Sequence, residues 1–204
     1  MTVYEDSVLD KEKGSKGIFN RIGVDDAAII VPIFEDRSLL MVENYRHGIA
    51  ANILELPGGL IKRDGAAAGN EQPADTARRE LLEETEYECQ VLEYAGSFYT
   101  WPGRSTQENF VFVAKGLEKN GTTKNLDNVQ LDDFEYIQVY KFTKEEVLQK
   151  IKNGCISSAV TLSALFFGYF DIRYINRRSA TNKQTSKHTR TQSRRRHTII
   201  PPKC

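Results

Sequence analysis

The sequence predicts an α+β fold in which a mixed β-sheet is flanked by a few helices. Residues 27–34, AAIIVPIF, form a β-branched and aliphatic run that is typical of a buried strand. Residues 109–114, NFVFVA, alternate aromatic and β-branched side chains, as expected for a central strand. Helical stretches begin at Pro73 and at the capping box of residues 143–146, TKEE, so strands and helices alternate and should pack as layers.

Further segments extend this pattern in chain order. Residues 1–26 are polar and form a predicted small N-terminal β region, with turns at Gly14 and Gly17. Residues 38–45, SLLMVENY, are interpreted as the hairpin partner of 27–34. Additional strands are expected over residues 53–56, 90–99 and 136–142, and helices over about 144–153 and 157–174.

Length and composition favour a soluble protein with one main domain. The 204 residues are 40% hydrophobic and 10% aromatic, which suffices for a sizeable core. No run of 18 apolar residues predicts a membrane span, and the charged N-terminus lacks the apolar region of a secretory signal. Cys89, Cys155 and Cys204 are few, odd in number and widely spaced, which indicates free thiols and a cytoplasmic location.

The zero net charge hides an asymmetry between the body of the chain and its end. Residues 173–204 contain ten Lys or Arg and no Asp or Glu, which leaves 18 basic and 28 acidic residues elsewhere. Residues 176–204 are predicted to form a basic, disordered tail, because they carry too few apolar side chains to offset their ordering entropy. We expect a solubilising or functionally neutral tail; a nucleic-acid partner is not expected and would bind only here.

The stretch from Gly65 to Tyr87, GAAAGNEQPADTARRELLEETEY, carries the strongest chemical signal in the chain. On a helix that begins at Pro73, the carboxylates of Glu80, Glu83 and Glu84 share one face. Like charges at these spacings repel, so a folded protein that concentrates them needs a cation. A hard divalent metal, Mg²⁺ or Mn²⁺, prefers such oxygen ligands. The alternative is a solvated acidic helix face without a metal.

The spacing around these carboxylates resembles a known motif. Five residues separate Gly65 from Glu71, and seven more lead to Arg79 and the carboxylates that follow it. All charged positions match the 23-residue Nudix box, so the chain resembles the Nudix hydrolase family. The resemblance implies an α/β/α sandwich of Nudix type over residues 27–175 and metal-dependent hydrolysis of a diphosphate bridge. Glu86 stands where the family has a helix-ending glycine, at an expected cost of about 1 kcal/mol.

Segments outside the box are similar to one branch of that family. Tyr45-Arg46, the LELPGG segment of residues 54–59, and Pro102, sixteen residues beyond Glu86, resemble the ADP-ribose and nucleoside-diphosphate-sugar pyrophosphatases. The resemblance covers roughly residues 24–170. It implies cleavage of ADP-ribose to AMP and ribose 5-phosphate, by a homodimer whose N-terminal strands cross between subunits.

Two other functions stay open at this point. One is a module of the same fold that binds a nucleotide sugar without cleaving it. The other is a house-cleaning hydrolase of nucleoside triphosphates or dinucleoside polyphosphates, because the box sets the chemistry while loops elsewhere select the substrate.

The resemblance implies a metal site on the box helix. Glu80 and Glu84 would be the main ligands and Glu83 would assist them, while a backbone carbonyl near Gly58 would complete the coordination. Arg79 can pair with Glu83 at i+4 and hold the catalytic carboxylates in place.

The resemblance also implies a general base and a substrate subsite. The base would come from the flexible loop before the penultimate helix, where Glu135 and Asp133 are the candidates; the alternative is that both are ordinary loop charges beside a strand. Arg46 and Glu55 are suited to phosphate oxygens and ribose hydroxyls, respectively. Trp101, beside Pro102, could stack a base or instead serve packing.

Overall fold

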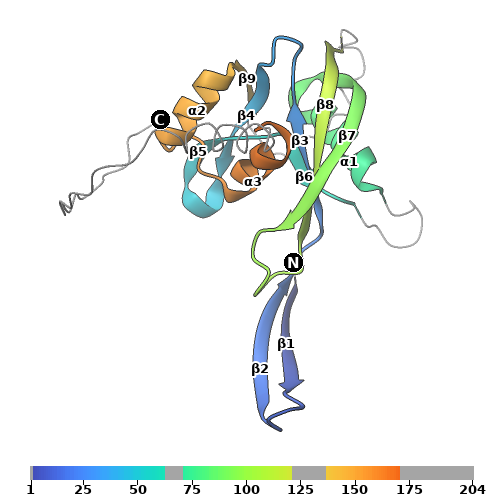
Figure 1. Cartoon of the computed structure of the whole chain (residues 1–204), viewed down its shortest axis with the longest axis vertical. Helices are drawn as coiled ribbons and strands as arrows, with labels where there is room; N and C mark the ends of the chain where they lie inside the picture. Colours follow the sequence, from blue (N-terminus) through green and yellow to red (C-terminus); the bar gives the residue numbers. More distant parts are fainter. Residues whose placement is uncertain (1, 63–70, 121–136, 171–204) are drawn as a thin grey trace, which may run out of the picture.

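The computed structural model describes residues 2–62, 71–120 and 137–170. Within these residues the chain forms nine strands and three α-helices (Figure 1). The strands are β1 (Thr2–Leu9), β2 (Lys16–Gly23), β3 (Ala27–Pro32), β4 (Leu39–Arg46), β5 (Ala51–Glu55), β6 (Gly58–Leu60), β7 (Tyr87–Tyr99), β8 (Glu108–Lys119) and β9 (Gln138–Phe142). The helices are α1 (Pro73–Thr85), α2 (Lys144–Lys152) and α3 (Ala159–Gly168), and a short 3-10 turn spans His47–Ile49.

A four-stranded mixed sheet with the order β6-β3-β8-β7 forms the centre of the molecule. The strand β3 runs parallel to β8, whereas the β3–β6 and β7–β8 pairs are antiparallel. All six residues of β3 are buried, because Ala28 and Ile30 pack toward α1 while Ile29 and Val31 belong to the core that includes α3. The sheet therefore lies between α1 and α3, as the prediction of a mixed sheet flanked by helices requires.

The predicted hairpin between residues 27–34 and 38–45 is wrong. The strand β4 does form, but it pairs with β5 and β9 in a separate three-stranded sheet. A single bridge between Ile33 and Leu39 is all that joins the two predicted partners. The reason is that β3 is buried on both faces and has both edges filled, by β6 and β8, which leaves no edge for β4.

Helix ends follow the local signals in the sequence. Pro73 opens α1, and the Thr143 side chain forms the predicted capping box with Glu146 at the start of α2. The last helix, predicted to reach about residue 174, ends at Gly168. Tyr169 leaves the helix and donates its hydroxyl to the Arg37 carbonyl at 2.7 Å, which fixes the helix end on the turn between β3 and β4.

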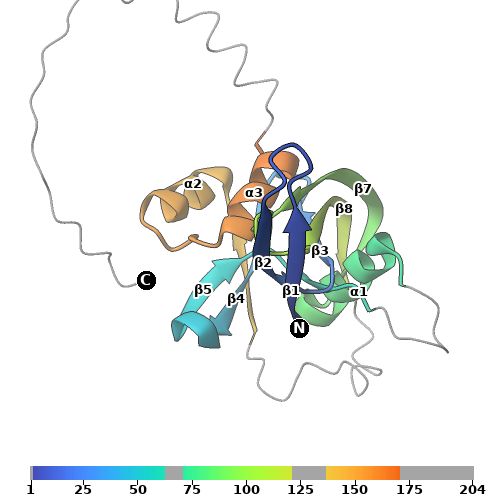
Figure 2. The same cartoon turned by 90° about the horizontal axis from the view of Figure 1, so that it is seen from below.

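The strands β1 and β2 form a hairpin that projects from the body and occupies the predicted N-terminal β region (Figure 1). Seen from below, the hairpin points toward the viewer in front of the body, with β4 and β5 to its left and α1 to its right (Figure 2). Its base is held by the loop after β7, since the Ile22 N–H donates to the Arg104 carbonyl at 2.7 Å. Several apolar side chains stay exposed, with Val3 at 70%, Ile18 at 67% and Phe19 at 57%.

Two predictions fall on segments outside the described residues. These are the disordered tail of residues 176–204 and the loop that contains Asp133 and Glu135. In the part of the chain that the structure describes, no helix has the length and apolar character needed to cross a membrane.

Candidate active site

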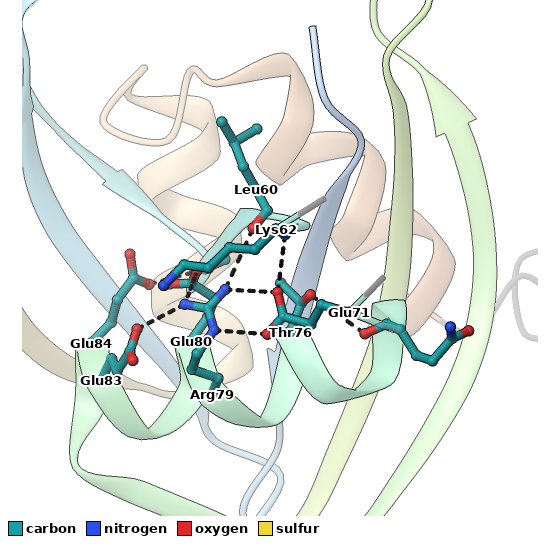
Figure 3. A network of polar contacts seen from close by, with 10 residues as sticks. Leu60, Lys62, Glu71, Thr76, Arg79, Glu80, Glu83 and Glu84 are labelled. Carbon is teal, nitrogen blue, oxygen red and sulfur yellow. Dashed lines mark hydrogen bonds and ion pairs between the residues drawn. The ribbon is translucent and has the colours of Figure 1, made fainter. Parts of the chain in front are cut away.

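The helix α1 places its acidic residues on one face because its other face is buried. Ala77, Leu81 and Thr85 are at most 2% exposed and pack toward the central sheet. Figure 3 shows the carboxylates of Glu80 and Glu83 beside the Arg79 guanidinium, together with Glu84 from the next position. Both faces follow from the 3.6-residue period, and both were predicted from the sequence.

Arg79 is the hub of this face. Its Nε lies 2.9 Å from Glu71 Oε1, and its Nη1 lies 2.7 Å from Glu80 Oε1 and 2.8 Å from Glu83 Oε2. Its Nη2 also donates to the Leu60 carbonyl at 3.4 Å, at the end of β6. The pairing with Glu83 confirms the i+4 expectation. The contacts with Glu71 and Glu80 were not predicted, although both positions belong to the charged pattern of the motif.

These contacts perturb the charges that they join. The hydrogen bond from Arg79 outweighs burial and lowers the pKa of Glu71 to about 2, with help from the Lys62 N–H at 3.0 Å. Burial lowers the pKa of Arg79, but the hydrogen bonds and charges of Glu71, Glu80 and Glu83 outweigh it and raise the pKa overall. Arg79 and Glu71 are therefore both charged at neutral pH, and their opposite charges hold the two side chains together.

The two glycines at the start of β6 bring the backbone against α1. The Gly58 N–H donates to Glu84 Oε2 at 2.9 Å. At Gly59, an added Cβ would lie 2.2 Å from Glu80 Oε1, so only glycine leaves room for that carboxylate. The structure thus places Gly58 beside a predicted ligand, and the recorded contact is through its N–H, whereas the prediction used its carbonyl.

The donor set suits a hard divalent cation. Glu80, Glu83 and Glu84 offer only carboxylate oxygens on one helix face, and Gly59 keeps open the space that the Glu80 carboxylate occupies. Within the described residues no three carboxylate, imidazole or thiol groups converge in a ready-made metal site. The carboxylates instead bind Arg79 and the Gly58 N–H, and coordination of Mg²⁺ or Mn²⁺ would require them to exchange these partners.

Arg46 and Glu55 lie on the adjacent strands β4 and β5 and form an ion pair through their side chains. Arg46 Nε lies 2.6 Å from Glu55 Oε2, and the two side chains are 46% and 12% exposed. The sequence nominated both as substrate ligands, but only the tertiary structure shows that they form one ion pair.

The loop after β7 holds Trp101 and Pro102 at the surface. Trp101 is 56% exposed, and its carbonyl accepts the N–H groups of Arg104 and Ser105 at 2.9 and 2.8 Å. The same loop contacts the hairpin base through the Ile22 N–H. Its role toward a substrate stays a prediction, as do those of Asp133 and Glu135, which lie outside the described residues.

Comparison with known proteins identifies the class to which this fold and site belong. The NUDIX domain profile matches residues 24–156, and the chain belongs to this family, which confirms the Nudix hydrolase prediction and its fold. Over 139 residues, 68% of this chain and 69% of the relative, the chain is 34% identical to a protein named methanol dehydrogenase activator from Bacillus methanolicus. Over 139 residues, which are 68% of this chain and 69% of the relative, the chain is 28% identical to an ADP-ribose pyrophosphatase of Bacillus subtilis.

A solved structure supports the fold independently. The crystal structure of an ADP compounds hydrolase superposes with a TM-score of 0.67 over 90% of this chain and 88% of that one. The sequence identity is 19%, so this likeness concerns the architecture alone.

Proposed function

We propose that this protein hydrolyses the pyrophosphate bond of a nucleoside diphosphate linked to a sugar, with ADP-ribose as the foremost substrate. Water and ADP-ribose would give AMP and ribose 5-phosphate. The observation that carries the proposal is the complete acidic face of α1, in which Arg79 joins Glu71, Glu80 and Glu83 while Glu84 meets the Gly58 loop.

The residues of this face have distinct roles in the proposal. Glu80 and Glu84, with Glu83 assisting, would hold Mg²⁺ or Mn²⁺, which neutralises phosphate oxygens and acidifies water when it is bound. Arg79 orients Glu80 and Glu83 through its 2.7 and 2.8 Å contacts. Glu135 or Asp133 is proposed as the general base that takes the proton from the attacking water.

The substrate class rests on residues outside the box and on one relative. Arg46 would bind a phosphate through its guanidinium, and Glu55, already paired with it at 2.6 Å, would accept ribose hydroxyls. Trp101, exposed beside Pro102, offers a ring for stacking on a base. The Bacillus subtilis relative bears the name ADP-ribose pyrophosphatase, which supports ADP-ribose over other sugar nucleotides.

A product assay on a substrate panel tests the proposal. The full chain is incubated with Mg²⁺ and ADP-ribose, ADP-glucose, GDP-mannose, UDP-glucose, a dinucleoside polyphosphate and nucleoside triphosphates. AMP with ribose 5-phosphate as the fastest-formed products would support the proposal. Preferred cleavage of triphosphates or polyphosphates would refute the substrate class, and binding without cleavage would refute hydrolysis.

The site assignment has its own test in the Glu84→Gln variant. Removing this charge should lower kcat by orders of magnitude with little change in Tm, since the amide keeps the size of the side chain but is a poor metal ligand. Glu145→Gln is the matched control, because Glu145 is an exposed acid in the first turn of α2. Unchanged turnover in Glu84→Gln would show that the site is misassigned.

We also propose a homodimer in which the β1–β2 hairpin contributes to the interface. A two-stranded ribbon is marginally stable alone, and this one exposes Val3, Ile18 and Phe19. Light scattering after size-exclusion chromatography should give a dimeric mass that Ile18→Glu reduces, whereas a monomeric wild type would refute the proposal.

The cytoplasmic location is likewise proposed. Cys89 and Cys155 are free thiols, which suits a reducing compartment. Cell fractionation tests the assignment, and recovery of the protein outside the cytoplasmic fraction would refute it.

A further inference from the structure

The 56–59 loop, which consists of Leu56 and Pro57 after β5 and the first two residues of β6, meets three different elements through consecutive backbone groups. The Leu56 N–H donates to Thr161 Oγ1 of α3 at 3.3 Å. The Pro57 carbonyl accepts the Ile30 N–H of β3 at 2.9 Å, and the Gly58 N–H donates to Glu84 Oε2 at 2.9 Å. The loop is therefore held from behind by α3 and β3 while its front touches α1.

The 56–59 loop has little room to move on the side that faces the carboxylates of Glu80 and Glu84. A Cβ at Gly59 would lie 2.2 Å from Glu80 Oε1, and one at Gly58 would lie 2.5 Å from the Ala28 carbonyl. A small shift of the loop would consequently press on Glu80 or break the contact with Glu84. The anchors behind the loop thus decide where two predicted metal ligands can lie.

Of the residues that hold the 56–59 loop, Thr161 is the one whose presence the stability of the fold explains least. The helix α3 is already capped by the Ser158 side chain, and its apolar packing comes from Ala164 and Leu165. Threonine is a poor helix former, yet Thr161 is 1% exposed and its hydroxyl faces the equally buried Leu56 N–H. Among the described residues, the hydrogen-bond partner of that hydroxyl oxygen is Leu56, the first residue of the loop against Glu80 and Glu84.

We propose that Thr161 is a positioning residue for the metal site: through the Leu56 N–H it sets the loop that places Glu80 and Glu84. The inference rests on the proposed function only in that it takes these carboxylates as metal ligands. Thr161 touches no reacting atom and acts through the 56–59 loop. Its loss should therefore weaken metal binding beyond what lower stability explains.

Three variants of the full chain separate positioning from stability. Thr161→Val keeps the shape and removes the acceptor, whereas Thr161→Ser keeps the hydroxyl. Val147→Ala, at a fully buried position on α2, serves as the control that loses stability away from the loop. If Thr161→Val does not fold, Thr161→Ala removes the same acceptor without placing a methyl group against the Leu56 N–H.

The readout is Mn²⁺ affinity, measured from the electron paramagnetic resonance signal of free Mn²⁺, alongside Tm. Thr161→Val should bind Mn²⁺ about tenfold more weakly than the wild type. Thr161→Ser should stay within about twofold, and Val147→Ala should keep wild-type affinity despite its lower Tm.

The outcomes distinguish this inference from the proposed function. Wild-type affinity in Thr161→Val, or equal loss in Val147→Ala, would overturn the positioning role. A wild type that binds no Mn²⁺ would overturn the role together with the metal site. If the wild-type protein binds Mn²⁺ but cleaves no nucleotide sugar, the proposed hydrolysis is refuted. The Mn²⁺ affinities of the Thr161 variants would still decide whether Thr161 positions the metal site.

Discussion

Gly59→Ala should abolish most activity without unfolding the protein. The added Cβ would lie 2.2 Å from Glu80 Oε1, and that oxygen must move by about 1.2 Å to reach the 3.4 Å at which ordinary contact begins. The obstructing atoms are the end of a flexible side chain, so the carboxylate can move aside while the backbone stays. Misplacing a reacting or ligating group by about 1 Å costs roughly 10²-fold in rate.

The assay compares Gly59→Ala with Gly58→Ala, its neighbour on β6. At Gly58 the new Cβ would lie 2.5 Å from the Ala28 carbonyl, which belongs to the backbone of β3 and cannot move aside cheaply. Gly58→Ala should therefore lower the free energy of unfolding by roughly 1–3 kcal/mol. Steady-state hydrolysis of ADP-ribose and thermal unfolding are measured for both. If Gly59→Ala keeps kcat within about threefold of the wild type, or loses as much Tm as Gly58→Ala, the reasoning fails.

Two further predictions concern stability. Glu86→Gly should raise the free energy of unfolding by about 0.5–1 kcal/mol, because Glu86 has a φ of 62° and its 3.0 Å pair with Lys119 is exposed. Thermal unfolding beside Glu86→Ala checks this, since alanine cannot relieve the left-handed strain, and equal Tm values would contradict it. The second prediction concerns pH. In the folded protein Arg79 lowers the pKa of Glu71 to about 2, from its ordinary 4.5. The stability that ionised Glu71 contributes is therefore complete above about pH 4.5 and disappears as the pH falls toward about 2. Solvent screens the pair, so the contribution stays below the roughly 3 kcal/mol that the full pKa shift would give. Glu71→Gln should flatten the fall in stability over that range in urea titrations, and an unchanged slope would argue against the Arg79–Glu71 pair.

The helix α1 shows how far local sequence reasoning extends. Pro73 at its start, its buried face and the i+4 pair of Arg79 with Glu83 all follow from residue spacing along one helix. The departure at Glu86 was also located correctly, since that residue caps the helix in the left-handed region. Such features depend on neighbours within a turn or two, which the sequence specifies directly.

The β4 strand shows what local sequence pattern does not specify. Its residues were correctly assigned to a strand, but the partner predicted for it, residues 27–34, was wrong, because hydrophobic pattern reports burial and does not say which edge is free. The tertiary structure alone shows the ion pair between Arg46 of β4 and Glu55 of β5. The packing of α3 brings Thr161 to Leu56, 105 residues away along the chain.

The sequence by itself determined the chemistry of this protein: a helix with three carboxylates on one face, an arginine to hold them, and the glycines that precede it. Only the tertiary structure decided that Arg79 also binds Glu71, that Gly59 makes room for Glu80, and that α3 supports the loop against Glu84. The physical reason is distance along the chain. Helical periodicity operates within a few residues, whereas contacts between elements depend on how sheets and helices pack, which no local pattern encodes.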